Sequence, residues 1–291
     1  MSEKLKISVI IPTYHDWPRL QLCLNALEAQ TIRQQDFEIL VVNNDPQDTP
    51  PIELKLPTNC QLLSEQKPGS YAARNAALGI AKGEVIAFTD SDCIPEENWL
   101  INAVERLQKG AERIAGRVEL FFKSDKLTLA EIYEKAFAFD QESNAKAGGS
   151  VTANMITWRK HFDTVGWFND SLMSGGDNEW GWRAKDLGIP IQYAPDVVVK
   201  HPARDSLKEI FQKQKRVSGG AAARSRSKFY GLTRSIIMGF LPPRAILLQW
   251  RAHRLTVSEK LTLTILVYIV KIYGTIFTIG VLFNLVKIAR S

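Results

Sequence analysis

Two aspartates, Asp90 and Asp92, directly follow the apolar run Val85–Phe88. The run is hydrophobic enough for a buried parallel strand, and open α/β sheets bind ligands at the carboxyl ends of such strands. In an extended chain, the spacing i, i+2 places both carboxylates on one face. Two such groups suit a hard divalent cation and the diphosphate that the cation would bridge. The alternative is a solvated turn at the strand end, because Asp and Ser are common in turns.

Other apolar runs predict the elements that would position these aspartates. Buried strands are expected at Ile7–Ile11, Phe37–Val42 and Cys60–Leu63. A helix is expected to begin at Pro18, and an Ala-rich helix to cover Tyr71–Ala81. Strands that alternate with helices of this length predict an α/β fold with a doubly wound, mostly parallel sheet.

The alternation continues through the second half of the chain as far as His201. The expected elements are a helix after Pro95, which would end the regular structure before it, a strand over Gly116–Phe122, a helix over Leu127–Glu142, a strand over Val151–Trp158, a helix starting at Ser174–Glu179, and short strands at Ile191–Tyr193 and Val197–Val199. We therefore expect a catalytic domain over residues 6–201 and a separate C-terminal region over residues 202–291.

Composition narrows the class of protein. The 291 residues are 45% hydrophobic and 23% charged, as in an ordinary globular protein. The three cysteines, Cys23, Cys60 and Cys93, are scattered and form no C-x-x-C pair. This pattern argues against a disulfide framework or a zinc site and fits a reducing cytosol. Because the charged start Met1–Lys6 leads directly into a strand, no secretory signal is expected.

The charges are distributed unevenly along the chain. Residues 202–291 carry 16 Lys/Arg and 3 Asp/Glu, a net of +13, whereas residues 1–201 carry 21 and 28, a net of −7. Such a basic region suits the anionic cytoplasmic face of a membrane. Nucleic-acid binding is not expected, because few aromatic residues are interleaved with these charges and no binding motif is present.

The C-terminal region also contains a long apolar segment, Leu261–Val286, whose single charge is Lys271. Its 26 residues are enough to cross a bilayer. Three alternatives are open: a single C-terminal span, a peripheral helix lying in the membrane interface, and a helix buried against the catalytic domain. A central lysine costs about 2.5–3.5 kcal/mol on insertion scales, which the neighbouring apolar residues could offset.

Six stretches match, in order, the motifs of a known family. They are Ile7–Tyr14, Phe37–Asn44, Ser70–Asn75 (S-Y-A-A-R-N), Thr89–Asp92, Gly175–Arg183 and His201. On these residues the chain resembles the family-2 glycosyltransferases, members of the nucleotide-diphospho-sugar transferase superfamily. The resemblance covers roughly residues 6–201 and implies a Rossmann-like GT-A fold. The C-terminal region lies outside it.

The resemblance implies a metal site at the paired aspartates. In the family the last aspartate of the D-x-D motif binds the metal and the first contacts the ribose of the nucleotide, which assigns these roles to Asp92 and Asp90. The histidine that ends the last core strand, here His201, is a further metal contact in many relatives. The expected ion is Mg²⁺ or Mn²⁺, which would neutralise the leaving diphosphate. A surface histidine is the alternative for His201.

The resemblance also implies a catalytic base for an inverting transfer. The family places an aspartate in a G-E-D-x-[DE] stretch at a helix start, and here Asp177 takes that position, with Gly176 in place of the preceding glutamate. Glu179, on the acceptor side, is the next candidate. The alternative for Asp177 is a carboxylate that only caps the helix. Trp180 and Trp182 could stack on an acceptor sugar or belong to the helix core.

Donor binding would fall to the loop Pro12, Thr13 and Tyr14, to Asn43 and to Arg74. Family members commonly have aspartate after the second strand, whereas this chain has Asn43 and Asn44, which leaves the base of the nucleotide open. Arg74 would contact the diphosphate or the base region; a surface salt bridge is the alternative. Gly149, in the pair Gly148–Gly149, would allow the backbone to approach the donor sugar.

Together these features predict an inverting, metal-dependent glycosyltransferase at the cytoplasmic face of the cell membrane. It would transfer a sugar from a nucleotide donor to a hydroxyl of a glycolipid or a growing polysaccharide of the cell envelope. A nucleotidyltransferase would need a basic, glycine-rich phosphate loop near the N-terminus, which is absent. A non-catalytic nucleotide-sugar-binding or membrane-scaffold protein would lack a base, so Asp177 argues against it and Gly176 slightly favours it.

Overall fold

The computed structural model describes residues 6–223, 227, 232–233, 237 and 256–286. Much of the predicted C-terminal region, including residues 238–255, lies outside this part. The chain divides into two compact units. The sheet unit comprises residues 1–119, 139–171 and 176–202, and the helical unit comprises residues 120–138, 172–175 and 203–291.

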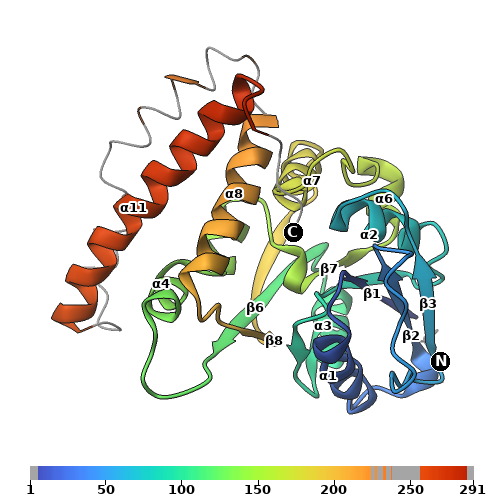
Figure 1. Ribbon diagram of the computed structural model, residues 1–291. Coiled ribbons are helices and arrows are strands. Elements are labelled where there is room, and N and C mark those ends of the chain that lie inside the picture. Colours follow the sequence, from blue (N-terminus) through green and yellow to red (C-terminus); the bar gives the residue numbers. More distant parts are fainter. Residues whose placement is uncertain (1–5, 224–226, 228–231, 234–236, 238–255, 287–291) are drawn as a thin grey trace. The chain divides into compact units, whose positions relative to one another are not determined.

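The sheet unit is built on strands in the order β3-β2-β1-β4-β7-β6-β8-β5 (Figure 1). Its parallel half consists of β1 (Ile7–Thr13), β2 (Phe37–Asn43), β3 (Cys60–Ser64) and β4 (Val85–Phe88). Because β1 and β2 pair in register from Ile7 with Phe37 to Thr13 with Asn43, their carboxyl ends meet at the same edge of the sheet.

The remaining strands are β5 (Ile94–Pro95), β6 (Arg113–Phe121), β7 (Met155–Trp158) and β8 (Ile191–Pro202). The pairs β4–β7, β6–β7 and β5–β8 are antiparallel. In the last of these, Ile94 faces Lys200, so the chain just after β4 lies beside the carboxyl end of β8. Residues more than one hundred positions apart are thereby brought together.

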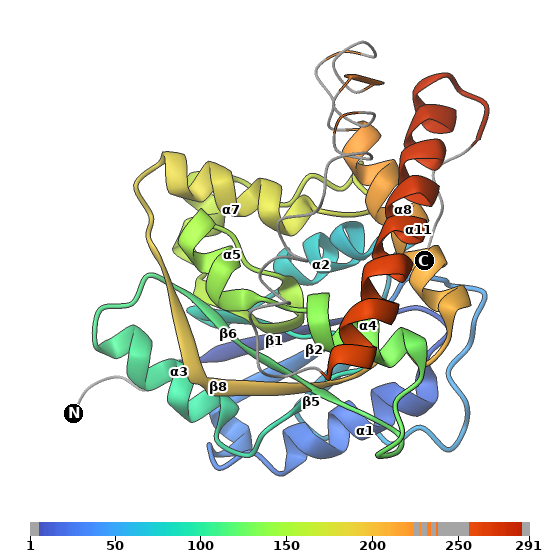
Figure 2. The ribbon, with the colours of Figure 1, turned by 90° about the vertical axis from the view of Figure 1, so that its left-hand side faces the viewer.

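Helices cover both faces of this sheet (Figure 2). On one face lie α1 (Trp17–Glu28) and α3 (Trp99–Gln108), whose side chains join Val9, Ile11 and Val41 in the main hydrophobic core. On the other lie α2 (Ser70–Leu78) and α7 (Gly176–Asp186). The unit also contains α5 (Gln141–Ala147), α6 (Lys160–Val165) and the 3₁₀ turns Gln34–Asp36 and Thr152–Asn154.

The helical unit contains α4 (Leu129–Phe137), α8 (Leu207–Ala223) and α11 (Val257–Leu282). Capping boxes at Thr128 and Thr256 start α4 and α11. The carboxylate of Glu134, which is fully buried, pairs with Arg204 Nη1 at 2.8 Å and with Lys213 Nζ at 3.0 Å. This charge cluster ties α4 to α8 and to the segment that precedes it.

The predicted α/β class is confirmed, and several boundaries differ. The helix expected over Leu127–Glu142 is two helices, because Phe139 adopts a left-handed φ of 55° and Asp140 caps a new helix. The strand expected from Val151 begins at Met155, after a 3₁₀ turn, and Pro95 belongs to β5 instead of ending the regular structure. The two short strands expected near the end of the sheet unit form the single strand β8.

Candidate active site

Asp90 and Asp92 lie in a turn directly after β4. The backbone N–H of Cys93 donates to the carbonyl oxygen of Asp90 at 3.1 Å, which closes the turn. The backbone therefore follows the turn alternative, but the carboxylates are not simply solvated. They face different partners: Asp90 lies toward α2, whereas Asp92 lies toward β8 and toward Arg19 of α1, whose Nη1 is 3.8 Å from Asp92 Oδ2.

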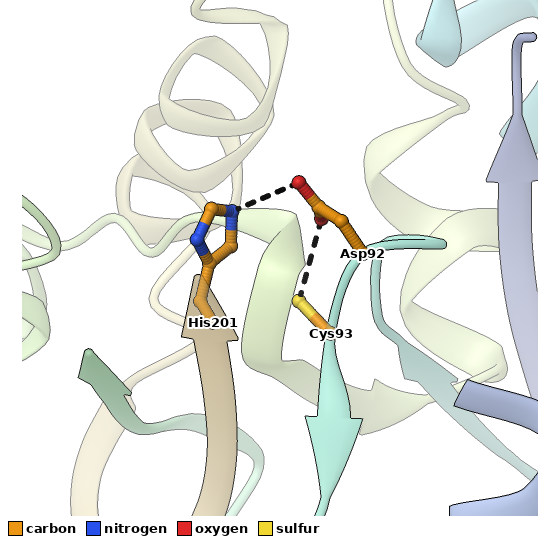
Figure 3. A group of neighbouring side chains, drawn as sticks. All are labelled: Asp92, Cys93 and His201. Atoms are coloured by element: carbon orange, nitrogen blue, oxygen red, sulfur yellow. Dashed lines mark hydrogen bonds and ion pairs between the residues drawn. The ribbon is translucent and has the colours of Figure 1, made fainter. Parts of the chain in front are cut away.

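The partner of Asp92 is His201, at the carboxyl end of β8 (Figure 3). Asp92 Oδ2 lies 3.4 Å from His201 Nε2, and the imidazole is only 4% exposed, so it is not a surface residue. Its Nδ1 lies 2.7 Å from the carbonyl oxygen of Pro202 and donates to it when the proton is on Nδ1. Nε2 then presents a lone pair to the carboxylate. Two acceptors in this arrangement are stabilised by a cation bound between them.

Cys93 stands beside this pair. Its thiol donates to Asp92 Oδ1 over 3.9 Å, and the ligand atoms of Asp92, Cys93 and His201 all lie within 4.8 Å of one another. Burial, followed by the negative charges of Asp92 and Asp90, raises the pKa of the thiol well above its ordinary value. A carboxylate oxygen and an imidazole nitrogen suit Mn²⁺ and, less closely, Mg²⁺. The thiol was not predicted; its only signal in the sequence is its place next to Asp92.

Arg74 holds the other aspartate. Its Nη2 lies 2.5 Å from Asp90 Oδ1, and its side chain is 3% exposed. The alternative of a surface salt bridge is therefore wrong. Within the described residues its buried Nε has no hydrogen-bond partner. The guanidinium also lies over the ring of Tyr71, 5.6 Å from its centroid, which links Asp90 to the next part of the site.

Asp177 lies in the first turn of α7 and is 8% exposed. Its Oδ1 accepts hydrogen bonds from the phenol of Tyr71 at 3.1 Å and from the backbone N–H of Asn178 at 2.9 Å. Burial raises the pKa of the carboxyl, while these two donors and the charge of Arg74 partly oppose the rise. Asp177 is thus a buried carboxylate that accepts a hydrogen bond from a second helix, α2. A residue that only caps α7 would need hydrogen bonds to the backbone of α7 alone.

Gly176 makes room for this arrangement. A Cβ on Gly176 would lie 2.8 Å and 2.9 Å from two carbons of the Tyr71 ring. The ring therefore fills the space beside the backbone where the family motif has glutamate. From the sequence, Tyr71 was predicted only to lie in a helix. Its spacing of three residues from Arg74 puts both side chains on one face of α2, which indicates that they belong to the same site.

Further residues predicted to bind the donor lie at the carboxyl ends of β1 and β2. Asn43 uses both ends of its amide within its own loop, donating to Asp48 O at 2.8 Å and accepting from Asp45 N at 3.0 Å. Thr13 opposes Asn43, and its buried hydroxyl has no partner among the described residues. Neighbouring Pro12 is buried, and the Tyr14 ring meets the His15 ring edge-on at 4.2 Å.

Comparison with known proteins identifies the family of this chain. The sequence profile described as glycosyl transferase family 2 matches residues 8–166, more than half of the chain. The chain belongs to glycosyltransferase family 2. The glycosyltransferase AglE of Haloferax volcanii is 35% identical over 276 residues, which cover 90% of each chain. A dolichyl N-acetyl-α-D-glucosaminyl phosphate 3-β-D-2,3-diacetamido-2,3-dideoxy-β-D-glucuronosyltransferase of Methanococcus voltae is 23% identical over 233 residues, covering 74% of this chain and 72% of that protein.

A solved structure supports the fold of this glycosyltransferase. The mannosyltransferase PcManGT of Pyrobaculum calidifontis, in complex with GDP-Man and Mn²⁺, superposes with a TM-score of 0.60 at 18% identity. The match covers 97% of this chain and 88% of that one. The predicted GT-A fold is confirmed, and the chain is a glycosyltransferase by family.

A buried arginine, Arg113, forms hydrogen bonds to the loop that contains the glycine pair Gly148–Gly149 of the glycosyltransferase. Arg113, 1% exposed, donates to the carbonyl oxygens of Gly148, Gly181 and Ile189, at distances between 2.8 and 3.3 Å. Burial lowers its pKa to about 10. A Cβ on Gly149 would lie 2.5 Å from Asn178 Oδ1, so this loop packs closely on the start of α7. The contacts of Arg113 were not predicted from the sequence. The feature that could have indicated them is an arginine at the start of an apolar strand.

The two candidate acceptor-side residues of the glycosyltransferase differ. Glu179 forms a two-pronged pair with Arg183, with N···O distances of 2.7 and 3.1 Å. Trp180 is 0% exposed, donates to Gly166 O at 2.8 Å and stacks on Phe162. Trp180 is therefore a core residue, and the interpretation that it stacks on an acceptor sugar is wrong.

Proposed function

We propose that this glycosyltransferase is inverting and metal-dependent, and that it transfers a sugar from a nucleotide-diphosphate donor to a hydroxyl of a glycolipid or polysaccharide. The observation that carries the proposal is the pair Asp92 Oδ2 and His201 Nε2, a carboxylate oxygen and an imidazole nitrogen 3.4 Å apart in the sheet unit. These residues would hold Mg²⁺ or Mn²⁺, and the Mn²⁺ bound to PcManGT supports the choice. When bound, the ion would neutralise the charge of the leaving diphosphate.

Asp177 is the proposed catalytic base. In one displacement, the acceptor oxygen forms a bond to the anomeric carbon, the bond from that carbon to the diphosphate breaks, and Asp177 takes the hydroxyl proton. The anomeric configuration inverts because nucleophile and leaving group lie on opposite sides of that carbon. Burial makes the Asp177 carboxylate a stronger proton acceptor than an exposed aspartate, since it raises the pKa. Tyr71 and Asn178 fix Oδ1, which sets the direction of the carboxylate.

The donor nucleotide is proposed to bind along the carboxyl edge of the parallel strands. Asp90 would receive the ribose and Arg74 would lie near the diphosphate, with its buried Nε available for a hydrogen bond. The other proposed donor contacts are Pro12, Thr13, Tyr14, Asn43 and Gly149. The unpartnered hydroxyl of Thr13 supports this placement, because a bound donor would satisfy it.

The acceptor is proposed to be lipid-linked or part of a growing envelope glycan, with Glu179 on its side of the site. The printed name of the Methanococcus relative, which specifies a dolichyl phosphate sugar, supports this class. We place the enzyme at the cytoplasmic face of the membrane. The helix α11 is long and apolar enough to cross a bilayer, by length and composition alone.

Metal binding gives the first test. Titration calorimetry of the purified chain with MnCl₂ should show binding that Asp92→Asn and His201→Gln each weaken about tenfold or more, a loss typical of removing a metal contact. Asp186→Asn, on the exposed end of α7, is the matched control and should leave binding unchanged. Unaltered Mn²⁺ binding in both site variants would refute the metal assignment.

Turnover gives the second test. The chain is incubated with Mn²⁺, a panel of nucleotide sugars and lipid extracts, and the products are identified. Release of a nucleoside diphosphate together with a glycosylated product indicates glycosyl transfer, whereas release of a sugar 1-phosphate would indicate transfer of the nucleotidyl group. Asp177→Asn should abolish transfer to the acceptor while leaving donor binding intact. Transfer that persists in this variant would exclude Asp177 as the base.

A further inference from the structure

One side of α11 is covered within the helical unit. Leu266 and Val270 pack with Ala130 of α4 and Ile210 of α8. Farther along, the ring of Tyr273 meets the ring of Phe211 at a centroid distance of 4.8 Å. A Cβ on Gly274 would lie within 3.0 Å of side-chain atoms of Gln214 and Ser218 on α8, so the two helices approach closely there. α11 is therefore a partnered helix.

The other side of α11 is an exposed apolar stripe. Its side chains recur every three or four residues and so share one face of the helix. They are Val257 (69% exposed), Leu261 (55%), Ile265 (66%), Ile269 (49%), Ile272 (47%) and Ile276 (64%). At 1.5 Å per residue the stripe is about 28 Å long. A continuous apolar surface of this length marks an interaction site more often than it is left in water.

The partner of α11 argues against a simple transmembrane span. α8 carries Lys208, Glu209, Lys213, Lys215 and Arg216 within its first ten residues. If α11 crossed the bilayer while packed on α8, these groups would enter the membrane with it. Each charged side chain near the bilayer centre costs about 2.5–3.5 kcal/mol on insertion scales. Spanning would therefore require α11 to leave the contacts that the structure shows.

The positive charge of the C-terminal region indicates which kind of surface the exposed apolar stripe binds. After Glu259, residues 260–291 contain no Asp or Glu, and residues 202–291 as a whole carry a net charge of +13. Lys and Arg near an anionic bilayer each contribute about 1 kcal/mol of attraction. A second copy of this chain would bring a further +13 against the same region, which like-charge repulsion disfavours. Apolar contact and charge thus both favour an anionic lipid surface.

We propose that α11 lies in the plane of an anionic membrane surface. The stripe is buried at the boundary between headgroups and acyl chains, while α4 and α8 cover the opposite, water-facing side of the helix. The attachment is monotopic and does not cross the bilayer. This docking does not depend on the proposed glycosyl transfer, so either can fail without the other.

Binding to vesicles tests the docking surface. The full chain should float with phosphatidylcholine vesicles that contain phosphatidylglycerol and much less with phosphatidylcholine alone. The triple variant Leu261→Gln, Ile265→Gln, Ile276→Gln should lose at least tenfold in vesicle affinity without loss of thermal stability, because these side chains are already exposed. The control pair Leu22→Gln and Leu187→Gln changes residues of similar exposure, 54% and 55%, in the sheet unit and should bind normally. Equal binding by the triple variant and the parent would overturn the proposal.

Depth measurements distinguish docking from spanning. Spin labels report the depth in the bilayer of one cysteine introduced at position 261, 272 or 283 in turn. The parent chain carries Cys60→Ser, and the remaining Cys23 and Cys93 are fully buried, so a label reacts with the introduced thiol. A helix in the interface gives similar shallow depths at all three positions. A deep label at position 272 between two shallow ones indicates a span and contradicts the proposal. So does a protein that ignores anionic vesicles and instead dimerises through the stripe.

Discussion

The phenol of Tyr71 donates to Asp177 Oδ1 at 3.1 Å, across 106 residues of sequence. Both side chains are nearly buried, so the bond is shielded from water. Gly176 leaves space for the aromatic ring, and Arg74 lies over its face. One helix, α2, thus supports the proposed base through Tyr71 and Asp90 through Arg74. Two residues one turn apart on α2 therefore contact both the proposed base and the proposed ribose-binding aspartate.

Tyr71→Phe should slow transfer without weakening donor binding. The ring keeps its packing against Gly176, but Asp177 loses one of the two donors that direct its Oδ1. A hydrogen bond to a charged group is worth about 1.5–3 kcal/mol, so kcat should fall about tenfold or more. Steady-state kinetics with the identified donor measure this. A fall in kcat/KM caused by KM for the donor alone would contradict a positioning role.

Gly176→Ala should also impair transfer, because the new methyl group would push the Tyr71 ring from its position. We expect a fall in kcat comparable to that of Tyr71→Phe, with some loss of thermal stability from overpacking, about 1–3 kcal/mol. Gly79→Ala is the control: a Cβ there meets its nearest neighbour at 3.4 Å, an ordinary contact, and φ is −63°. Wild-type kinetics in Gly176→Ala would show that the ring position is not needed.

The acid limb of the activity profile should report Asp177. A base must be deprotonated, so transfer rises as pH increases through its pKa, which burial raises above the ordinary 3.8. The hydrogen bond from Tyr71 lowers this pKa, and its removal in Tyr71→Phe should therefore move the limb to higher pH. Rates measured from acidic to neutral pH in both proteins test the sign. A limb that moves to lower pH would contradict the assignment.

Glu134→Gln should destabilise the helical unit. Burial alone would raise the pKa of Glu134, but the charges of Lys213 and Arg204 outweigh it and lower the pKa from 4.5. The stabilisation is thus present above pH 4.5 and is lost as pH falls through the lowered value. At neutral pH the variant removes the negative charge that Arg204 and Lys213 both contact, and it should lose about 3–5 kcal/mol of unfolding free energy. Denaturant unfolding measures the loss.

The exposed pair Glu142–Lys146 supplies the matched control for that measurement. Glu142→Gln should change the unfolding free energy by about 0.5 kcal/mol or less, as surface ion pairs do. The difference between Glu134→Gln and the parent should shrink in acid, because the parent then carries a protonated Glu134 as well. A difference that is constant with pH would show that charge does not hold the cluster.

Trp180→Ala should act on stability. The indole is fully buried against Phe162, and its removal should cost about 3–5 kcal/mol. Trp182→Ala, at a residue 48% exposed, should cost less than about 1 kcal/mol. Thermal unfolding of the two variants gives the comparison. Equal stability of both would contradict the core assignment of Trp180.

Local sequence patterns predicted the strands of the parallel half of the sheet well. The runs at Ile7 and Phe37 are strands because continuous apolar residues can be buried on both faces of a parallel sheet. The end of α4 was missed, since Phe139 is neither Gly nor Pro and no short-range signal shows that it adopts φ of 55°. Long-range packing decides that conformation.

The site shows the same limit. The family motifs pointed to Asp92, Asp177 and His201, whose roles remain predictions. No motif predicted which neighbouring side chains would contact these residues. Tyr71 and Arg113 act on groups far away in sequence, and only the paired strands and helices bring them together. Trp180 was ambiguous because a tryptophan suits both a helix core and a sugar-binding surface.

The short pairing of β5 with β8 has a consequence for how the protein is made. Asp92 and His201 become neighbours only when Ile94 lies opposite Lys200, near the end of the sheet unit. During synthesis, the parallel strands β1 to β4 leave the ribosome long before that partner exists. Such non-local closure is a slow and late event in folding. A nascent chain thus carries Asp92 without His201 until about two thirds of the sequence has been translated, so the pair of side chains is completed late in folding.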